Sequence, residues 1–228
     1  MSAKAASSNQ IMPEILKISS DASLKDHTQH IRETLRKGGV IAFPTDTYYG
    51  LGTDPFNQEG IRRIFEIKSR KADKPLLVLV ASASQVDQLA QSRSQEADRL
   101  IQEFWPAPLT LVFKAVPELP DSLTAKTATV GIRMPGNEWT RRLIEAAGCP
   151  LTAPSANRNN EAASQTADEV AQTFGDEIDL IIDPGPAPGG RVSTLLDTTT
   201  RPPVLIRHGA ITQREIESVL NMECTLVS

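Results

Sequence analysis

Six cationic side chains lie between residues 61 and 74 of a chain that carries a formal net charge of −4 over 228 residues. Three of them, Lys68, Arg70 and Lys74, fall where a predicted helix gives way to a loop before an apolar strand. Loops at strand ends bind ligands in α/β folds, and Lys and Arg side chains suit a polyphosphate. A solvated helix end, where cations favour the helix dipole, would explain the same charges. The residue types alone leave both interpretations open.

Two further loops carry hydroxyl and amide side chains. Residues 44–52 (PTDTYYGLG) follow one apolar strand, and residues 152–157 (TAPSAN) follow another. Each loop is compatible with an ordinary turn, in which Asp46 and the threonines satisfy local backbone groups. The other interpretation is a pocket wall, whose hydroxyls and closely approaching glycines contact a small polar ligand.

The sequence lacks the motifs of several common sites. It has no Walker-type phosphate loop and no G-x-S-x-G nucleophile elbow, and the glycines at 50 and 52 lack the third glycine of a dinucleotide fingerprint. Its three histidines and two cysteines show no zinc-ligand spacing. Negative net charge and an aromatic content of 4% argue against a general nucleic-acid coat protein. We therefore expect a local cationic pocket and no metal centre.

The elements that must position these residues are apolar strands alternating with amphipathic helices, which predicts an α/β or α+β layered fold. We expect strands at 15–18, 40–43, 76–80, 109–113, 130–133, 151–153, 178–182, 193–197 and 204–207. Predicted helices begin at Asp21 or Ser23, after Asn57, over about 138–147, and after the capping boxes Thr166–Glu169 and Thr212–Glu215.

One domain is expected, with no internal repeat. Residues 1–14 are predicted to be a flexible leader, because they are rich in Ser and Ala and lack the apolar core of a secretory signal. Residues 222–228 are expected to be a short tail. No stretch approaches ~18 consecutive apolar residues, so no membrane span is predicted. Two cysteines require no disulfide, which favours a reducing cytoplasm.

Eight short motifs in a fixed order give the chain a specific resemblance. They are PTDTYYGLG (44–52), KSR (68–70), KPL (74–76), WPAPLT (105–110), GIRMP (131–135), APSAN (153–157), ST (193–194) and PVLIR (203–207). Together they resemble the YrdC-like family, the threonylcarbamoyl-AMP synthases. The resemblance implies a twisted mixed α/β sheet with flanking helices around a deep basic cavity, and a single catalytic domain over residues 15–221.

The resemblance also implies an activity. Members of the family are nucleotidyltransferases that condense L-threonine, bicarbonate or CO₂, and ATP to threonylcarbamoyl-AMP, releasing pyrophosphate. Partner transferases then use the product for threonylcarbamoyl-adenosine modification of tRNA. This chain is therefore expected to use ATP, with Mg²⁺, in the cytoplasm, with at most weak contact to tRNA or other RNA.

Site residues follow from the matching motifs. ATP is expected to contact Arg70, Lys74, Thr129, Ser155, Asn157 and Arg207. L-threonine is expected to contact Thr47, Arg133, the backbone of Ala153, and Ser193. Lys68 and Arg70 are expected to be catalytic, by offsetting charge at the phosphates. The assignment of Arg133 agrees with its chemistry, because a guanidinium at a strand end can pair bidentately with an amino-acid carboxylate.

Two positions depart from the family pattern. Leu79 stands where many relatives have a histidine near the threonine pocket, and Ala163 stands where many have a serine. These departures keep two alternatives open. One is a paralogue of the same fold acting on another acceptor, and the other is an RNA-binding or ribosome-maturation factor that uses the basic cavity.

Overall fold

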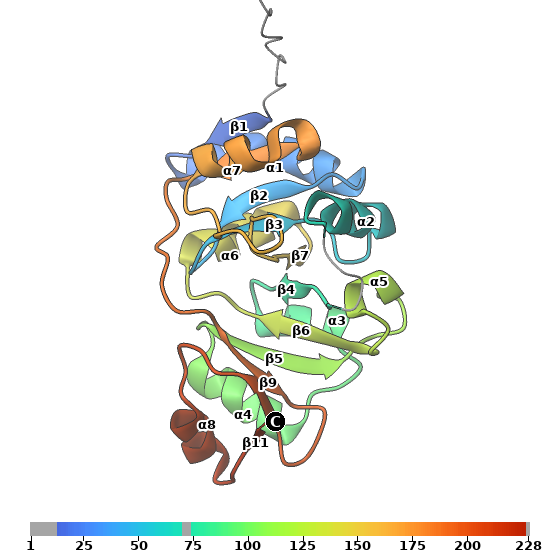
Figure 1. The fold of residues 1–228 in the computed structure, drawn as a ribbon, viewed down its shortest axis with the longest axis vertical. Helices are drawn as coiled ribbons and strands as arrows, with labels where there is room; N and C mark the ends of the chain where they lie inside the picture. Colours follow the sequence, from blue (N-terminus) through green and yellow to red (C-terminus); the bar gives the residue numbers. More distant parts are fainter. Residues whose placement is uncertain (1–12, 70–73, 227–228) are drawn as a thin grey trace, which may run out of the picture.

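Two mixed sheets, flanked by helices, make up the part of the chain that the structure describes (Figure 1). The structure is a computed structural model, and it describes residues 13–69 and 74–226. In spatial order, the smaller sheet contains β1 (Glu14–Lys17), β8 (Leu180–Asp183), β2 (Ile41–Pro44) and β3 (Tyr49–Gly52). The larger sheet contains β11 (Thr225–Leu226), β10 (Val204–Arg207), β9 (Thr194–Asp197), β5 (Leu109–Lys114), β6 (Thr129–Arg133), β4 (Leu77–Leu79) and β7 (Leu151–Thr152).

Helices flank both sheets. They are α1 (Asp21–Arg36), α2 (Gln58–Ile67), α3 (Val86–Leu89), α4 (Gln95–Phe104), α5 (Asp121–Thr124), α6 (Glu138–Ala147), α7 (Ala167–Phe174) and α8 (Gln213–Leu220), with 3₁₀ turns at Ala83–Gln85 and Gly175–Glu177. Helix α1 packs against α6, and α4 packs against α8. Figure 1 shows α1 and α7 beside the smaller sheet and α4 and α8 beside the larger one.

Strand β2 shows why the predicted strands are apolar throughout. Successive side chains of a strand point to opposite faces. Ile41 and Phe43 therefore enter a core that includes α1 and α6, while Ala42 enters the larger core on the other face. All three side chains are fully buried. Full burial of an Ile or Phe side chain stabilises a fold by about 1.5–3 kcal/mol, so both faces hold this strand in place.

Most predicted elements are confirmed, including the mixed α/β class, with the strands divided between two sheets. Asn57 caps α2, and the side chains of Thr166 and Thr212 form the two predicted capping boxes. Helix α4 was not predicted. Strand β3 was not predicted either, because its glycines indicate a turn. Gly52 is needed there, since a Cβ at this position would lie 2.5 Å from the ring of Phe43.

Residues 1–12 of the predicted leader lie outside the described residues, and its last residue, Glu14, begins β1. Most of the segment expected to be a tail is described. Within the segment expected to be a tail, Thr225–Leu226 forms β11 and pairs in parallel with β10. Among the described residues, no helix is long and apolar enough to cross a bilayer.

Candidate functional site

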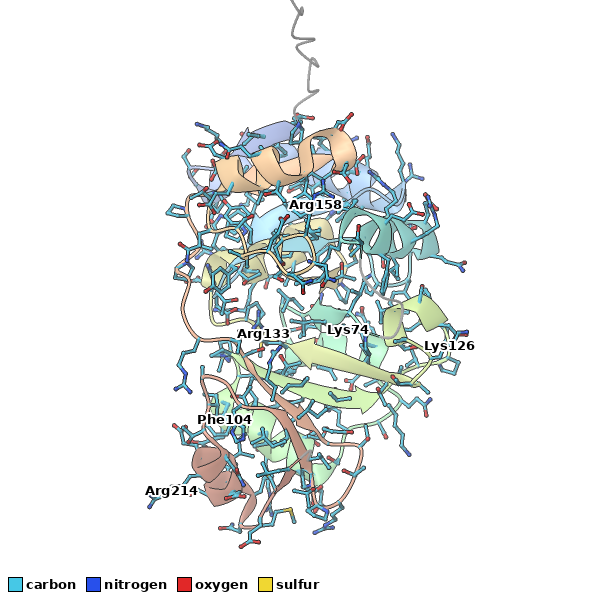
Figure 2. All side chains as sticks on the ribbon, viewed as in Figure 1. Lys74, Phe104, Lys126, Arg133, Arg158 and Arg214 are labelled. Atoms are coloured by element: carbon cyan, nitrogen blue, oxygen red, sulfur yellow. The ribbon has the colours of Figure 1, made fainter. Side chains whose placement is uncertain are left out.

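A cavity of about 590 Å³ is lined by residues from both sheets. This volume lies within the range of about 300–1,000 Å³ that is typical of small-molecule sites. The charged side chains in its described lining are Lys74, Arg133 and Arg207, all cations. Figure 2 shows Lys74 and Arg133 in the middle of the molecule, between the elements of the two sheets. A ligand that carries negative charge therefore suits this cavity.

The structure brings most of the predicted site residues together. Those in the cavity lining are Thr47, Lys74, Thr129, Arg133, Ala153, Ser155, Ser193 and Arg207. Lys68 and Asn157 do not line the cavity. Asn157 belongs to the loop that contains Ser155, and Lys68 donates to a carbonyl of that loop. Arg70 lies outside the described residues. With Thr110, which also lines the cavity, residues from seven of the eight motifs meet at one place, which sequence spacing alone does not show.

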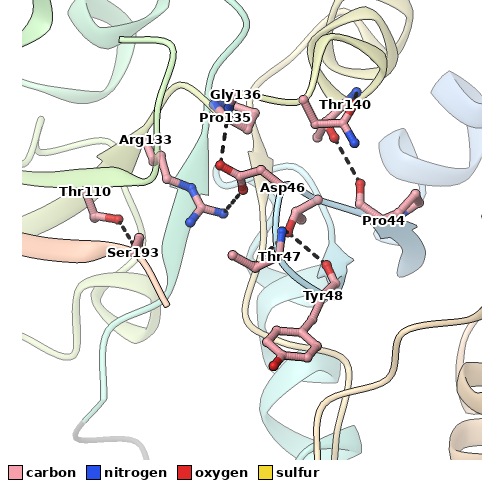
Figure 3. A network of polar contacts seen from close by, with 12 residues as sticks. Pro44, Asp46, Thr47, Tyr48, Thr110, Arg133, Pro135, Gly136, Thr140 and Ser193 are labelled. Atoms are coloured by element: carbon pink, nitrogen blue, oxygen red, sulfur yellow. Dashed lines mark hydrogen bonds and ion pairs between the residues drawn. The ribbon is translucent and has the colours of Figure 1, made fainter. Parts of the chain in front are cut away.

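Arg133, at the end of β6, is buried with only 4% of its side chain exposed. Its Nη2 lies 3.0 Å from Oδ1 of Asp46, and Oδ2 of Asp46 accepts a hydrogen bond from the amide of Gly136 at 3.2 Å (Figure 3). Burial lowers the pKa of Arg133, while Asp46 opposes that shift and the charge of Arg207 adds to it. Asp46 therefore supplies the negative charge that keeps a guanidinium in this wall.

The sequence leaves open two interpretations of the loop at 44–52, and Asp46 is not confined to the local turn role of the first. Its carboxylate reaches Arg133 and Gly136, which lie far away in the sequence. Thr45 does play the predicted local role, because its hydroxyl donates to the carbonyl of Tyr48 at 2.8 Å and accepts from the amide of Thr47 at 3.2 Å. Thr45 thus fixes the turn between β2 and β3 through local hydrogen bonds, and Asp46 fixes it through its contacts with Arg133 and Gly136.

Arg207 and Ser193 form a second polar cluster in the wall. The guanidinium of Arg207 donates from Nε and Nη2 to the carbonyl of Ser193, at 3.1 and 2.9 Å, and from Nη2 to the Ser193 hydroxyl at 2.9 Å. That hydroxyl lies 3.1 Å from the hydroxyl of Thr110. A register shift between β9 and β10 occurs just before Arg207. Such irregularities redirect side chains next to functional sites.

Lys68 holds the loop that carries Ser155 and Asn157. Its Nζ donates to the carbonyls of Ser155 and Asn157, at 2.5 and 2.7 Å, and to Oδ1 of Asn157 at 3.2 Å. Arg158, in the same loop, donates to the carbonyls of Ile67 and Thr173, at 3.1 and 3.0 Å. The end of α2 and this loop therefore hold each other through Lys68 and Arg158.

The two departures from the family pattern lie outside the cavity lining. Leu79 is fully buried in the core that includes α1 and α6, so it contributes packing and no polar contact. Ala163 precedes Ser164, whose carbonyl accepts a hydrogen bond from the amide of Tyr49 at 2.9 Å. Leu79 and Ala163 therefore contribute no group to the described lining of the cavity, and the polar groups there come from other residues.

The residues present do not fit a protein-bound Mg²⁺. No group of three or more His, Cys, Asp or Glu side chains among the described residues is arranged to hold a metal ion. The described lining of the cavity also lacks a carboxylate, the ligand that Mg²⁺ prefers. Any Mg²⁺ that takes part would enter with its own anionic ligand.

Two residues of this site were missed by the sequence analysis, Asp46 as a partner of Arg133 and Thr110 as a partner of Ser193. Both lie inside motifs that carry the family resemblance, at 44–52 and 105–110. Their positions in those motifs were the available signal. The sequence does not indicate which residues they pair with, because only tertiary packing brings these side chains together.

Comparisons with known proteins identify relatives of this chain. A protein of Pyrococcus abyssi named threonylcarbamoyl-AMP synthase is 42% identical over 82% of this chain and 55% of its own length. One of Coxiella burnetii with the same name is 32% identical over 78% of this chain and 97% of its own length. The chain thus spans about half the length of some curated relatives that it matches.

Solved structures show the same likeness. A crystal structure of P. abyssi Sua5 complexed with L-threonine matches with a TM-score of 0.83 and 38% identity, covering 95% of this chain and 62% of that one. The crystal structure of E. coli YciO matches with a TM-score of 0.75 and 25% identity, covering 91% and 98%. A family model, Sua5_yciO_yrdC, described as "Telomere recombination", matches residues 33–209. The chain belongs to the Sua5/YciO/YrdC family.

Proposed function

We propose that this chain is a nucleotidyltransferase that condenses L-threonine, bicarbonate or CO₂, and ATP to threonylcarbamoyl-AMP, with release of pyrophosphate. The observation that carries the proposal is the cavity itself, in which a buried Arg133 faces the same space as Lys74 and Arg207. The names of the relatives and the L-threonine in the P. abyssi complex support the same substrate.

Arg133 is proposed to bind the carboxylate of threonine. Its guanidinium is buried, carries a pKa lowered by that burial, and is balanced by one carboxylate, that of Asp46. A second carboxylate would offset the desolvation further, with the bidentate geometry that Arg favours. Thr47, Ser193 and the backbone of Ala153 line the cavity and are proposed to contact the rest of the amino acid.

Lys74 and Arg207 are proposed to contact the phosphates, with hydroxyls from Thr129 and Ser155 in the same lining. Arg70, outside the described residues, remains part of this proposal because it lies in the same motif as Lys68. Lys68 and Asn157 are proposed to act through the loop that presents Ser155. This assigns Lys68 a positioning role, in place of the direct contact that the resemblance implied.

The proposed reaction needs no protein nucleophile. The threonine amine combines with CO₂, losing a proton, or with bicarbonate, losing water, to give a carbamate. A carbamate oxygen then attacks the α-phosphorus of ATP, and the bond from that phosphorus to the departing pyrophosphate breaks. Negative charge grows on the leaving pyrophosphate, where fixed cations stabilise it. Such catalysis consists mainly of positioning and electrostatic stabilisation.

The activity is tested by measuring pyrophosphate release from Mg²⁺ and ATP, with L-threonine and bicarbonate omitted in turn. We expect release that requires both. Release that is independent of threonine would contradict the proposal, as would its absence from folded protein. The product would then pass to a transferase that modifies an adenosine of tRNA.

A further inference from the structure

Thr110 and Ser193 form a buried pair of hydroxyls in the cavity wall, near Arg133 (Figure 3). Each residue is 3% exposed, and both line the cavity. Their oxygens lie 3.1 Å apart, so one hydroxyl donates to the other. The methyl group of Thr110 lies beside Gly131, where an added Cβ would be 3.4 Å from it. The glycine thus leaves room for the methyl, while the hydroxyl lies next to Ser193.

A count of protons shows that this pair has one donor to spare. Two hydroxyls carry two protons, and one proton is used in the bond between them. Arg207 donates to the Ser193 oxygen at 2.9 Å and, as a guanidinium, accepts nothing in return. Among the described residues, neither hydroxyl has a further acceptor within hydrogen-bond distance. The second proton is therefore available to a molecule in the cavity.

The charge of Arg207 decides which hydroxyl provides that proton. A hydrogen bond from a cation polarises the hydroxyl that accepts it and makes its own proton a better donor. This polarisation favours Ser193, which accepts from Arg207, as the donor to Thr110. The proton of Thr110 is then the last in a chain of donors and is the one available to a molecule in the cavity.

We propose that Thr110 contacts the amino-acid substrate and determines its specificity, by donating a hydrogen bond to the side-chain hydroxyl of L-threonine. This inference rests on the proposed function. Arg133 provides a charged donor for the substrate carboxylate, whereas Thr110 provides a neutral donor that matches a neutral oxygen. A site built to hydrogen-bond a substrate hydroxyl discriminates strongly against an analogue that lacks it. L-valine, in which a methyl replaces the hydroxyl, is such an analogue.

The test compares the binding of L-threonine and L-valine by calorimetry in the full chain and in three variants. Thr110→Val removes the hydroxyl and keeps the shape, and Thr110→Ser keeps the hydroxyl. Thr198→Val is the matched control. Thr198 is a buried threonine that directly follows β9, its hydroxyl donates to the Val112 carbonyl at 2.7 Å, and it does not line the cavity. Melting temperatures show that each variant folds.

We expect Thr110→Val to weaken L-threonine binding roughly tenfold or more while leaving L-valine binding unchanged. Thr110→Ser and Thr198→Val should retain the preference for threonine. If Thr110→Val keeps the same threonine-to-valine ratio as Thr198→Val, the inference is overturned. Should Thr110→Val not fold, Thr110→Ala is measured against the same expectation. If the unsubstituted chain binds no L-threonine at all, the proposed function fails and this inference with it.

Discussion

Arg133 and Asp46 form a buried ion pair, with Nη2 and Oδ1 3.0 Å apart, between elements of the two sheets. Arg133 ends β6 of the larger sheet, and Asp46 lies in the turn between β2 and β3 of the smaller one. The pair therefore holds two walls of the cavity together and places a guanidinium where a carboxylate can reach it. The contribution of this pair to stability can be tested by mutation.

Asp46→Asn should destabilise the protein strongly, because it leaves the buried charge of Arg133 uncompensated. Removing one partner of a buried ion pair lowers the free energy of unfolding by about 3–5 kcal/mol. Urea unfolding measures this change. Asp21→Asn is the control, since Asp21 pairs with Arg142 on the surface, where both side chains are about half exposed. Equal losses of stability in the two variants would contradict the role given to the buried pair.

Lys74→Ala should weaken ATP binding while leaving L-threonine binding close to that of the unsubstituted chain. Lys74 lines the cavity, and loss of a charged hydrogen-bond donor to phosphate corresponds to roughly tenfold or more in affinity. Equilibrium dialysis with labelled ATP provides the measurement. Lys114→Ala, at the exposed end of β5, serves as a matched control. Unchanged ATP affinity in Lys74→Ala would remove this residue from the phosphate site.

Lys68→Met should lower the melting temperature and ATP affinity together. Lys68 is 5% exposed and donates to three oxygen atoms of the loop that presents Ser155, so its loss leaves acceptors of Ser155 and Asn157 without their donor. Differential scanning calorimetry and ATP dialysis on the same preparation separate the two effects. A variant that melts like the unsubstituted chain but loses turnover would indicate direct catalytic contact, contrary to the positioning role.

The buried environment of Tyr49 predicts that the folded protein loses stability at alkaline pH. Tyr49 is fully buried, and its hydroxyl donates to the Gly185 carbonyl at 2.9 Å and lies 3.3 Å from Oδ1 of Asp183. Burial, followed by the charge of Asp183, raises the pKa of Tyr49 above its ordinary value of 10.0. The folded state therefore favours the neutral phenol. The stabilisation that the neutral Tyr49 hydroxyl provides is fully present below the pKa that Tyr49 has in the unfolded chain. It is lost as pH rises through the pKa that Tyr49 has in the folded protein.

The measurement is the free energy of unfolding between pH 8 and pH 11 for the unsubstituted chain and Tyr49→Phe. Above about pH 10, the unsubstituted chain should lose stability more steeply than the variant, which has no ionisable hydroxyl at this position. Curves that stay parallel over the whole range would show that Tyr49 ionises alike in both states.

Local chemistry accounts for the parts of the fold that the sequence predicted well. In the helix caps at Asn57, Thr166 and Thr212, the cap side chain accepts from an amide only three residues away. A short sequence motif is therefore enough to predict each cap. Strand β2 is apolar throughout because both its faces are buried. Strand β3 was missed because Gly52 is selected by its approach to Phe43, a contact that local propensity does not contain.

The candidate site, like the fold, could be predicted from the sequence only in part. The family resemblance indicated which motifs contribute to it, and the structure brings residues of those motifs to one cavity. The pairing of Asp46 with Arg133 could not be predicted, because it depends on how the two sheets pack. The placement of Lys68 behind its loop was not predictable either, since a lysine can reach phosphate or carbonyl oxygen with equal ease.

Mass spectrometry of the product formed from ATP, Mg²⁺, L-threonine and ¹³C-bicarbonate tests the central claim most directly. The proposed reaction predicts an adenylate that carries both threonine and one labelled carbon, and that disappears when threonine or ATP is omitted. A threonine adenylate without the label, or the absence of any adenylate from folded protein, would contradict it.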